Sequence, residues 1–308
     1  MNYTLHQLRI FAKVCDCQSI TKASEALYLT QPAVSLQLKK LQNEFEIPLT
    51  EVIGRQLYVT DFGKEIYRLA REILDKVDKI ETATDHYRGV LTGNIRIASA
   101  STGKYVLPYF LTDFMRQHAG VNVSISVTNK MKVVESLQEN SVDFALVSIL
   151  PQNMALETVP LIQNELQLVG ATNYPKLGGK MMAKTLSDYP LIFRENGSAT
   201  RNVMQSFLNQ NQVQVKRSME LQSNEAVKQA VIAGLGLSIM PIIGIQSELA
   251  LKKLKLVAIK GLPIKTQWNL VYGSGKKLSP ANQALINYIR ENKKQISRVY
   301  FSKEEIVA

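Results

Sequence analysis

Apolar residues recur every three or four positions in three successive segments near the start of the chain. This spacing places them on one face of a helix in each segment. The three faces consist of Leu5, Leu8, Phe11, Ala12 and Cys15, then Ala23, Ala26 and Leu27, then Val34, Leu38 and Leu41. Ser19 or Thr21 is suited to cap the second helix, and Thr30 to cap the third. The pattern therefore predicts three short helices between residues 5 and 42.

The third predicted helix begins with a polar turn that contains Pro32. Proline is tolerated there because the first turn of a helix leaves its N–H groups without partners. Two short helices joined by a tight turn form a helix-turn-helix, whose second helix fits the DNA major groove. Gln31 and Ser35 share one face of it; Gln can pair with adenine, and Ser with a base or a phosphate. Lys39 and Lys40 follow, in positions suited to the DNA backbone.

The segment after the third helix predicts a wing. Residues 56–60 form a short strand-like run after Gly54, and Arg55 lies at the turn. A wing arginine can reach a phosphate or a narrow minor groove. The alternative is an ordinary solvated surface arginine.

A long helix is predicted from Thr60 and Asp61, which cap it, to about Val90. At about 1.5 Å per residue it would measure roughly 45 Å. Apolar residues repeat every seven positions along it, in two interleaved series: Ile66, Ile73, Ile80 and Tyr87, and Ala70, Val77 and Thr84. Such a heptad seam favours pairing with a second copy of the chain. The alternative is packing of this face on the body of the same chain.

Beyond Gly93 short strand-like runs alternate with helical segments. The predicted strands are 94–99, 121–127, 142–148, 166–171 and 190–193, and the predicted helices are 104–117, 130–140, 200–210 and 224–233. This alternation is typical of an α/β fold with mostly parallel sheets. About 216 residues suffice for two such lobes, and open α/β sheets bind ligands where strands end and helices begin.

Composition indicates an ordinary globular protein of 308 residues, with 45% hydrophobic and 20% charged residues. The net charge of +11 does not mark the N-terminus as the DNA binder, because residues 1–92 hold twelve basic and twelve acidic residues. We expect a cytoplasmic location, since neither an apolar run of about 18 residues nor a signal-like start is present. The only cysteines, Cys15 and Cys17, suggest neither a disulfide nor a zinc site.

Two long stretches carry a resemblance to a known family. FAKVCDCQSITKASEALYLTQPAVSLQLKKLQNEFEIPL with GRQLYVTDFG resembles the winged helix-turn-helix of LysR-type transcriptional regulators, and RENGSATR with SNEAVKQAVIAGLGLSIMP resembles their effector domain. The C-terminal phrases look most like the branch that regulates carbon fixation, sulfur and nitrogen assimilation genes. Such regulators are usually homotetramers that bind two spaced DNA sites and change the DNA bend when a small metabolite binds.

The resemblance implies an α/β protein with three parts. These are a winged helix-turn-helix (1–60), a linker and dimerisation helix (61–92), and a two-lobed, periplasmic-binding-protein-like effector domain (93–308). Lobe I would comprise about 93–164 and 268–308, and lobe II about 165–267.

The family's DNA contacts carry over to this chain with one notable departure. The expected DNA-binding residues are Thr21, Thr30, Gln31, Pro32, Ser35, Leu36, Lys39 and Arg55. The family commonly has a base-reading arginine where this chain has Leu36, which offers only apolar contact, for example to a thymine methyl. Gln42, Glu46, Thr50 and Val52 also depart from the usual Glu, Gly, Phe and Arg. The DNA target should therefore differ from the family average.

Hydroxyl and basic residues at predicted helix starts indicate an anion site between the lobes. The expected effector-binding residues are Ser101, Thr102, Ser148, Ser198, Thr200, Arg201 and Asn224, with Ser223 beside them. Free N–H groups at helix starts bind anions, and Arg201 could hold a carboxylate or phosphate through two hydrogen bonds. The alternative is that each residue only caps a helix. The predicted partners are double-stranded DNA with a roughly palindromic site, a small anionic effector and further copies of the chain, with no membrane.

Two other functions fit the sequence less well. Catalysis would need a base, a nucleophile or a metal cluster, and the three histidines, His6, His86 and His118, lie on different elements; no cofactor or metal is expected. A transport solute receptor would share the two-lobed half, but here a helix-turn-helix precedes it in place of an export signal.

Overall fold

A computed structural model describes residues 2–54, 56–87, 91–175 and 181–301, except the side chains of 78, 79 and 81–87. The chain divides into two compact units, an N-terminal unit of residues 1–93 and a C-terminal unit that holds most of 94–308. Each unit is described by itself. Within the described ranges, no helix is both long and apolar enough to cross a membrane.

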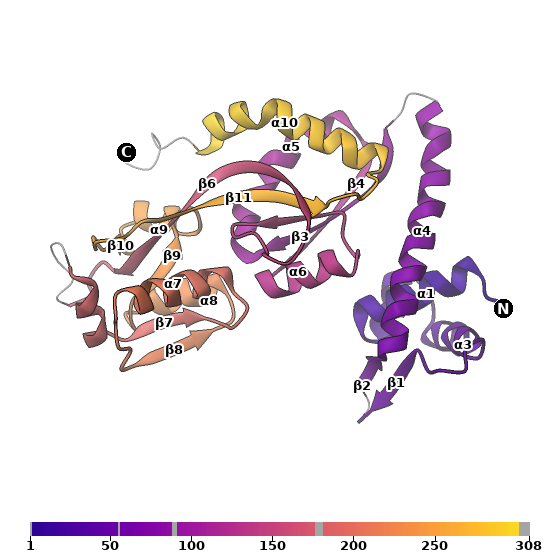
Figure 1. Cartoon of the computed structure of the whole chain (residues 1–308), viewed down its shortest axis with the longest axis horizontal. Helices are drawn as coiled ribbons and strands as arrows, with labels where there is room; N and C mark the ends of the chain where they lie inside the picture. Colours follow the sequence, from indigo (N-terminus) through magenta and orange to yellow (C-terminus); the bar gives the residue numbers. More distant parts are fainter. Residues whose placement is uncertain (1, 55, 88–90, 176–180, 302–308) are drawn as a thin grey trace. The chain divides into compact units, whose positions relative to one another are not determined.

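The N-terminal unit consists of a three-helix head, a two-stranded wing and a long helix (Figure 1). Its elements are α1 (Leu5–Cys17), α2 (Ile20–Leu27), α3 (Gln31–Gln42), β1 (Thr50–Ile53), β2 (Gln56–Val59) and α4 (Asp61–Tyr87). Most of the predicted helical stripes form its core, in which Phe11, Val34 and Leu41 are completely buried, whereas Leu5 and Ala26 are exposed. The three predicted helices are confirmed, and so is the long helix as far as Tyr87; its predicted end near Val90 lies outside the described residues.

Local residues fix how the wing joins α4. The wing strands pair antiparallel, with Glu51 opposite Tyr58. The Thr60 hydroxyl accepts a hydrogen bond from the N–H of Gly63 at 2.9 Å, which caps α4. Gly63 lies so close to the wing that an added Cβ would be 2.0 Å from the carbonyl oxygen of Leu49, so only glycine fits.

The C-terminal unit has two lobes joined by two long strands. The first lobe contains β3 (Thr92–Ala100), η1 (Ser101–Tyr105), α5 (Leu107–Gln117), β4 (Gly120–Thr128), α6 (Lys130–Gln138), β5 (Phe144–Val147) and α10 (Pro280–Phe301). The second lobe contains η2 (Ala183–Asp188), β7 (Leu191–Arg194), α7 (Ala199–Gln210), β8 (Ser218–Leu221), α8 (Asn224–Ile232), β9 (Ser238–Pro241), η3 (Ile242–Gly244), α9 (Gln246–Ala250) and β10 (Leu254–Leu256). The joining strands are β6 (Leu156–Ala171) and β11 (Ile264–Gly273).

The prediction of mostly parallel sheets was wrong. The large sheet has the order β10-β6-β11-β5-β3-β4, with β9 also on β6. The pairings of β6 with β9, β10 and β11, and of β11 with β5, are antiparallel, whereas β3–β5 and β7–β8 are parallel. The reason is that β6 carries the chain to the second lobe and β11 brings it back, so the two must run in opposite directions.

Two further features of the C-terminal unit were not predicted. The expected helix 104–117 is divided into η1 and α5, and Pro108 lies in the first turn of α5. The final helix α10 was not among the predicted elements. Its buried residues Ala281, Leu285, Ile286, Ile289 and Ile296 nevertheless follow helical spacing.

Candidate functional site

The start of α3 forms an exposed polar surface on the N-terminal unit. Val34, Leu38 and Leu41 are buried beneath it, whereas Thr30, Gln31, Pro32, Ser35 and Lys39 are exposed. The Thr30 hydroxyl accepts a hydrogen bond from the N–H of Ala33 at 3.4 Å and so fixes where the helix begins. The helix thus presents Gln31 and Ser35 outward, as reading a DNA groove requires.

The other three predicted DNA-contact residues are Leu36, Thr21 and Arg55, which lie on different parts of the N-terminal unit. Leu36 is 53% exposed on the same helix, so it is an apolar group among polar ones and is accessible to a partner. Thr21 is exposed on α2, and its carbonyl oxygen accepts a hydrogen bond from the Ser24 hydroxyl at 2.7 Å. Arg55 lies outside the described residues.

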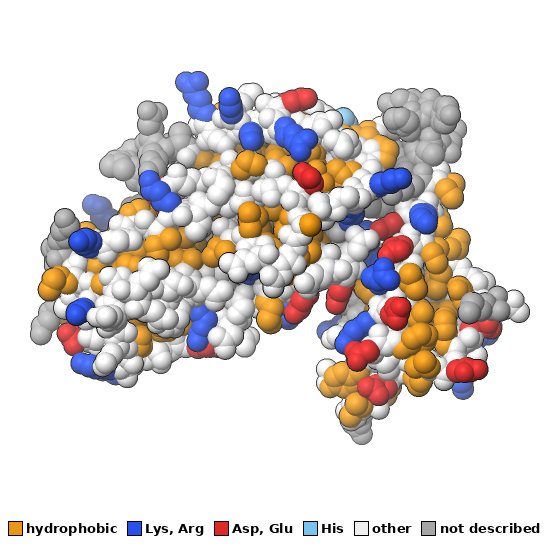
Figure 2. Space-filling model, viewed as in Figure 1, with side chains coloured by type: hydrophobic (Ala, Val, Ile, Leu, Met, Phe, Trp, Pro, Cys, Tyr) orange, Lys and Arg blue, Asp and Glu red, His pale blue; other side chains and the backbone are white. Residues whose placement is uncertain are grey.

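The predicted dimerisation seam on α4 is divided between two faces. Ile73 and Ile80 are 38% and 71% exposed, and Leu69 beside them is 40% exposed. Hydrophobic side chains are accordingly visible along α4 in Figure 2. Ala70 is instead 2% exposed within the core of its own unit, so its assignment to the seam was wrong. Ile66 and Val77 are half-buried, Ile66 against the same core, and the side chain of Tyr87 lies outside the described residues.

A cavity of about 470 Å³ lies between the two lobes of the C-terminal unit. Four segments line it: η1, the β4–α6 connection, the end of β7 and the start of α8. Two of these segments belong to each lobe. The cavity is therefore formed only when the lobes are assembled.

Ser101 lies at the centre of the contacts in this cavity. Its hydroxyl oxygen accepts hydrogen bonds from Nη1 of Arg194 at 3.0 Å and from Nδ2 of Asn224 at 2.8 Å, both in the second lobe. A hydroxyl oxygen has two lone pairs, and both are used, so the Ser101 hydrogen is available to donate to a ligand. The Oδ1 atom of Asn224 is buried and accepts no hydrogen bond from any described residue.

The charged residues of the cavity favour a small anion. Lys104, Lys132 and Arg194 line it together with Glu195 and Glu225. Arg194 is 3% exposed, and its guanidinium donates to both carboxylate oxygens of Glu195, at 2.8 and 2.9 Å. Hydrogen bonding to Gln229, with help from Lys228, holds the pKa of Glu225 below its ordinary value. The lining thus has one more positive than negative charge, and the Arg194 charge is already balanced by its neighbour.

The structure brings together only part of the predicted effector set. Ser101, Asn224 and the neighbouring Ser223 line the cavity, whereas Thr102, Ser148, Ser198, Thr200 and Arg201 do not. Thr102, Ser198 and Thr200 are buried, at 6%, 3% and 9% exposure. Arg201 donates to Oε2 of Glu220 and to the carbonyl oxygen of Arg194, both at 2.6 Å. Its guanidinium therefore has partners outside the cavity, and its contact with an anion stays a prediction.

Sequence reasoning missed Arg194, Lys104, Lys132, Thr128, Asn129 and Gln222. Arg194 stands in the same RENGSATR motif as Arg201, seven positions earlier, so the motif does contain a residue that lines the cavity. Lys104 follows Ser101 by three positions, on the same short helix. The β4–α6 residues carried no such local signal.

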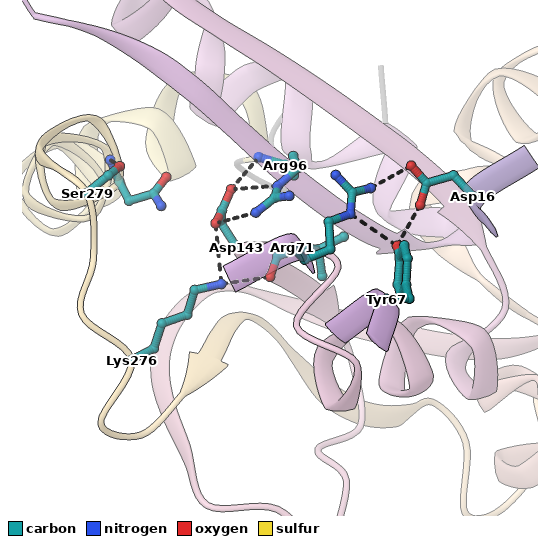
Figure 3. Close-up of polar contacts among 9 residues, drawn as sticks. Asp16, Tyr67, Arg71, Arg96, Asp143, Lys276 and Ser279 are labelled. Carbon is teal, nitrogen blue, oxygen red and sulfur yellow. Dashed lines mark hydrogen bonds and ion pairs between the residues drawn. The ribbon is translucent and has the colours of Figure 1, made fainter. Parts of the chain in front are cut away.

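Other titratable residues form structural groups outside the cavity. Asp143 accepts from the Arg96 N–H at 2.9 Å and pairs with Lys276 at 3.3 Å, as Figure 3 shows. Burial raises the pKa of the Cys15 thiol, which keeps it in its unreactive form. Within the described ranges, no three His, Cys, Asp or Glu residues come together as metal ligands would.

Comparison with known proteins gives consistent matches along the whole chain. The model for "Bacterial regulatory helix-turn-helix protein, lysR family" matches residues 5–64, and that for "LysR substrate binding domain" matches residues 88–294. The RuBisCO operon transcriptional regulator of Allochromatium vinosum is 36% identical over 290 residues, which cover 94% of this chain and 96% of that protein. The transcriptional activator CmpR of Synechocystis sp. is 33% identical over 297 residues, covering 96% and 98%.

A solved structure resembles the C-terminal unit. The regulatory domain of Synechocystis CcmR in complex with 2-PG is 33% identical, with a TM-score of 0.62. The matched region covers 65% of this chain and 97% of the CcmR domain.

Proposed function

The chain belongs to the LysR family of bacterial DNA-binding transcriptional regulators, and we propose that a small anionic metabolite in the cavity between its lobes controls how it binds DNA. The carrying observation is the Ser101 hydroxyl in this cavity, which accepts hydrogen bonds from Arg194 and Asn224 of the other lobe. Because both of its lone pairs are used, its hydrogen can be donated to an anionic oxygen of the ligand. Lys104 and Lys132 supply the positive charge.

We propose an organic phosphate or carboxylate of few carbons as the effector class. A cavity of about 470 Å³ suits a small metabolite. The regulatory domain of CcmR, one of the similar structures, holds 2-phosphoglycolate.

Coupling to DNA would follow from hydrogen bonds between the lobes. Ser101 of the first lobe holds Arg194 and Asn224 of the second, and the N–H of Met131 donates to the carbonyl oxygen of Gly197 at 3.2 Å. An anion that binds Ser101 alters this set and so favours one arrangement of the lobes over another. A ligand shifts such an equilibrium only by its difference in affinity for the two arrangements.

For the N-terminal unit we propose that α3 reads one half-site, with the contacts named from the sequence. Leu69, Ile73 and Ile80 on α4 would pair with a second copy, giving a homodimer, or two dimers in a tetramer. We retain 1–60, 61–92 and 93–308 as the functional divisions. We further propose a cytoplasmic protein without enzymatic activity, acting on genes of carbon fixation, as the names of its relatives suggest.

The proposal is tested with the full-length protein. At a ligand concentration of about 100 times Kd, binding stabilises the folded state by about 2.7 kcal/mol. We therefore expect 2-phosphoglycolate to raise the melting temperature by several degrees, and glycolate or inorganic phosphate alone to raise it less. Footprints on DNA upstream of carbon-fixation genes should change when the compound is added. No thermal shift with any carboxylate or phosphate would refute the effector assignment, and an absence of footprints would refute the regulatory one.

A further inference from the structure

A polar cluster joins the end of α1 to α4 in the N-terminal unit (Figure 3). Oδ1 of Asp16 accepts from the Tyr67 hydroxyl at 2.6 Å, and Oδ2 accepts from Nη2 of Arg71 at 2.5 Å. Nε of Arg71 also donates to the Tyr67 hydroxyl oxygen at 3.2 Å. We call Asp16, Tyr67 and Arg71 the head clamp.

The position of Asp16 carries an electrostatic cost that the clamp offsets. Asp16 stands in the last turn of α1, where the negative end of the helix dipole disfavours an acidic side chain. The guanidinium of Arg71 lies against it, and the two side chains are only 28% and 19% exposed. The Tyr67 hydroxyl is protonated at neutral pH even at its ordinary pKa, and burial, then the nearby Asp16 charge, raise that pKa further.

Helix α4 has one face for its own head and another that is open. Tyr67, Ala70 and Leu74 are buried in the head core, at 8%, 2% and 8% exposure. The open face holds Leu69, Ile73 and Ile80. If a second copy covers the open face, any rotation of α4 against its head changes the distance between the two recognition helices.

The clamp resists that rotation better than the apolar contacts do. Hydrophobic packing is non-directional, so it opposes separation more than sliding. Charge-assisted hydrogen bonds depend strongly on direction. Tyr67 and Arg71 are one helical turn apart on α4 and hold the two oxygens of one carboxylate, so a turn or slip of α4 breaks at least one of the bonds.

We propose that the head clamp fixes the angle between the DNA-reading head and α4, and thereby selects the spacing between the two DNA half-sites. The proposal rests on the dimeric DNA-binding function proposed above. Asp16, Tyr67 and Arg71 act as positioning residues for α3 and need touch no DNA.

The experiment measures spacing preference with the full-length protein. The wild type first selects a preferred duplex from random-sequence DNA, and base pairs are then inserted or removed one at a time between its half-sites. The wild type should show a sharp optimum of affinity. Tyr67→Phe keeps the ring and Asp16→Asn keeps the shape of the side chain, and both variants should flatten this optimum. The measured quantity is the ratio of the affinity at the best spacing to the affinity at a spacing shifted by two base pairs. We expect this ratio to fall by about five-fold, which corresponds to the loss of one hydrogen bond.

Matched controls come from the same helix. Arg68 and Glu72 form an ion pair at 2.7 Å, with side chains 47% and 44% exposed, and Arg68→Gln should leave the spacing profile unchanged. The idea is refuted if the clamp variants keep the wild-type profile, or lose affinity equally at every spacing, as a purely structural role predicts. If the wild type itself selects no DNA with two half-sites, the dimeric function fails first and the clamp proposal falls with it.

Discussion

The DNA-reading surface and the effector cavity are built in opposite ways. Apart from Thr21 and Arg55, the proposed reading residues lie on α3 or at its cap, within ten consecutive positions from Thr30 to Lys39. The cavity residues come from four segments spread between Ser101 and Glu225, and Arg194 and Asn224 are buried. A surface made by one helix depends on local geometry, whereas a cavity between lobes depends on how distant segments pack. Changes to the two should therefore differ in kind as well as in size.

The largest effect should come from a buried charge of the C-terminal unit. Asp143 is 8% exposed and balances Arg96 and Lys276, so Asp143→Asn removes the negative charge that faces both cations. We expect the free energy of unfolding of this unit to fall by about 3–5 kcal/mol. Urea unfolding measures this. The exposed pair in the N-terminal unit gives the contrast, since Arg68→Gln should cost under about 0.5 kcal/mol. Equal losses would contradict the expected difference between a buried and an exposed ion pair.

The same residue gives a pH dependence. Burial alone would raise the pKa of Asp143, but the cations of Arg96 and Lys276 outweigh it and hold the pKa below its ordinary value. Because the folded pKa is the lower one, the contribution to stability is complete above the unfolded value of about 3.9. It is lost as pH falls through the folded value. Unfolding measured below pH 4 should therefore depend more steeply on pH in the wild type than in Asp143→Asn.

The next largest effect should be on effector binding. Ser101→Ala removes the acceptor for Arg194 and Asn224 and the donor to the ligand. Affinity for 2-phosphoglycolate should fall by about 1.5–3 kcal/mol, or 10- to 100-fold, as for a hydrogen bond to a charged group. Calorimetric titration measures it. Ser148→Ala is the matched control, because Ser148 does not line the cavity; an equal loss there would speak against the site.

A comparable but sequence-dependent effect should come from the reading helix. Gln31 is exposed, so Gln31→Ala should leave the melting temperature unchanged. Recognition of one base pair should relax at a cost of about 1–3 kcal/mol. Binding to a panel of single-base-pair variants of the preferred site measures this. A loss that is equal on every DNA would mean that Gln31 only positions the protein on the backbone.

The smallest effect should come from restoring the arginine that the family commonly has. Leu36 is 53% exposed, so Leu36→Arg fits without repacking. We expect a gain in DNA affinity of about 1 kcal/mol or less. If the new arginine neutralises one phosphate, the plot of the logarithm of the binding constant against the logarithm of the salt concentration should become steeper by about 0.9. Titrations at several salt concentrations measure both. An unchanged slope with altered base preference would indicate a contact to a base edge instead.

Individual residues show where sequence reasoning succeeded and failed. Ala70 repeats every seven residues with Val77, yet the three-helix head lies against it and buries it. Periodicity identifies a face of a helix but not what covers that face. The mostly parallel sheet failed for a similar reason, since strand direction depends on how β6 and β11 travel between the lobes.

The two arginines of RENGSATR illustrate the limit most clearly. Strands β7 and β8 pair in parallel, with Phe193 opposite Glu220, and this register places Glu220 within reach of Arg201. Arg194, at the end of β7, is left to face Ser101 and the cavity. Both arginines are visible in the sequence, but the pairing that places them differently joins residues 27 positions apart, such as Phe193 and Glu220.

By itself, the amino-acid sequence determined the three head helices, the long helix and the outward position of Gln31 and Ser35. Those features follow from helical spacing and capping, which act over three to seven residues. Only the tertiary structure decided that Arg194, Lys104 and Lys132 line the cavity, that Ala70 is buried and that Asp16 meets Tyr67 and Arg71. These contacts arise when elements distant in the chain pack together, and local periodicity carries no record of which elements will meet.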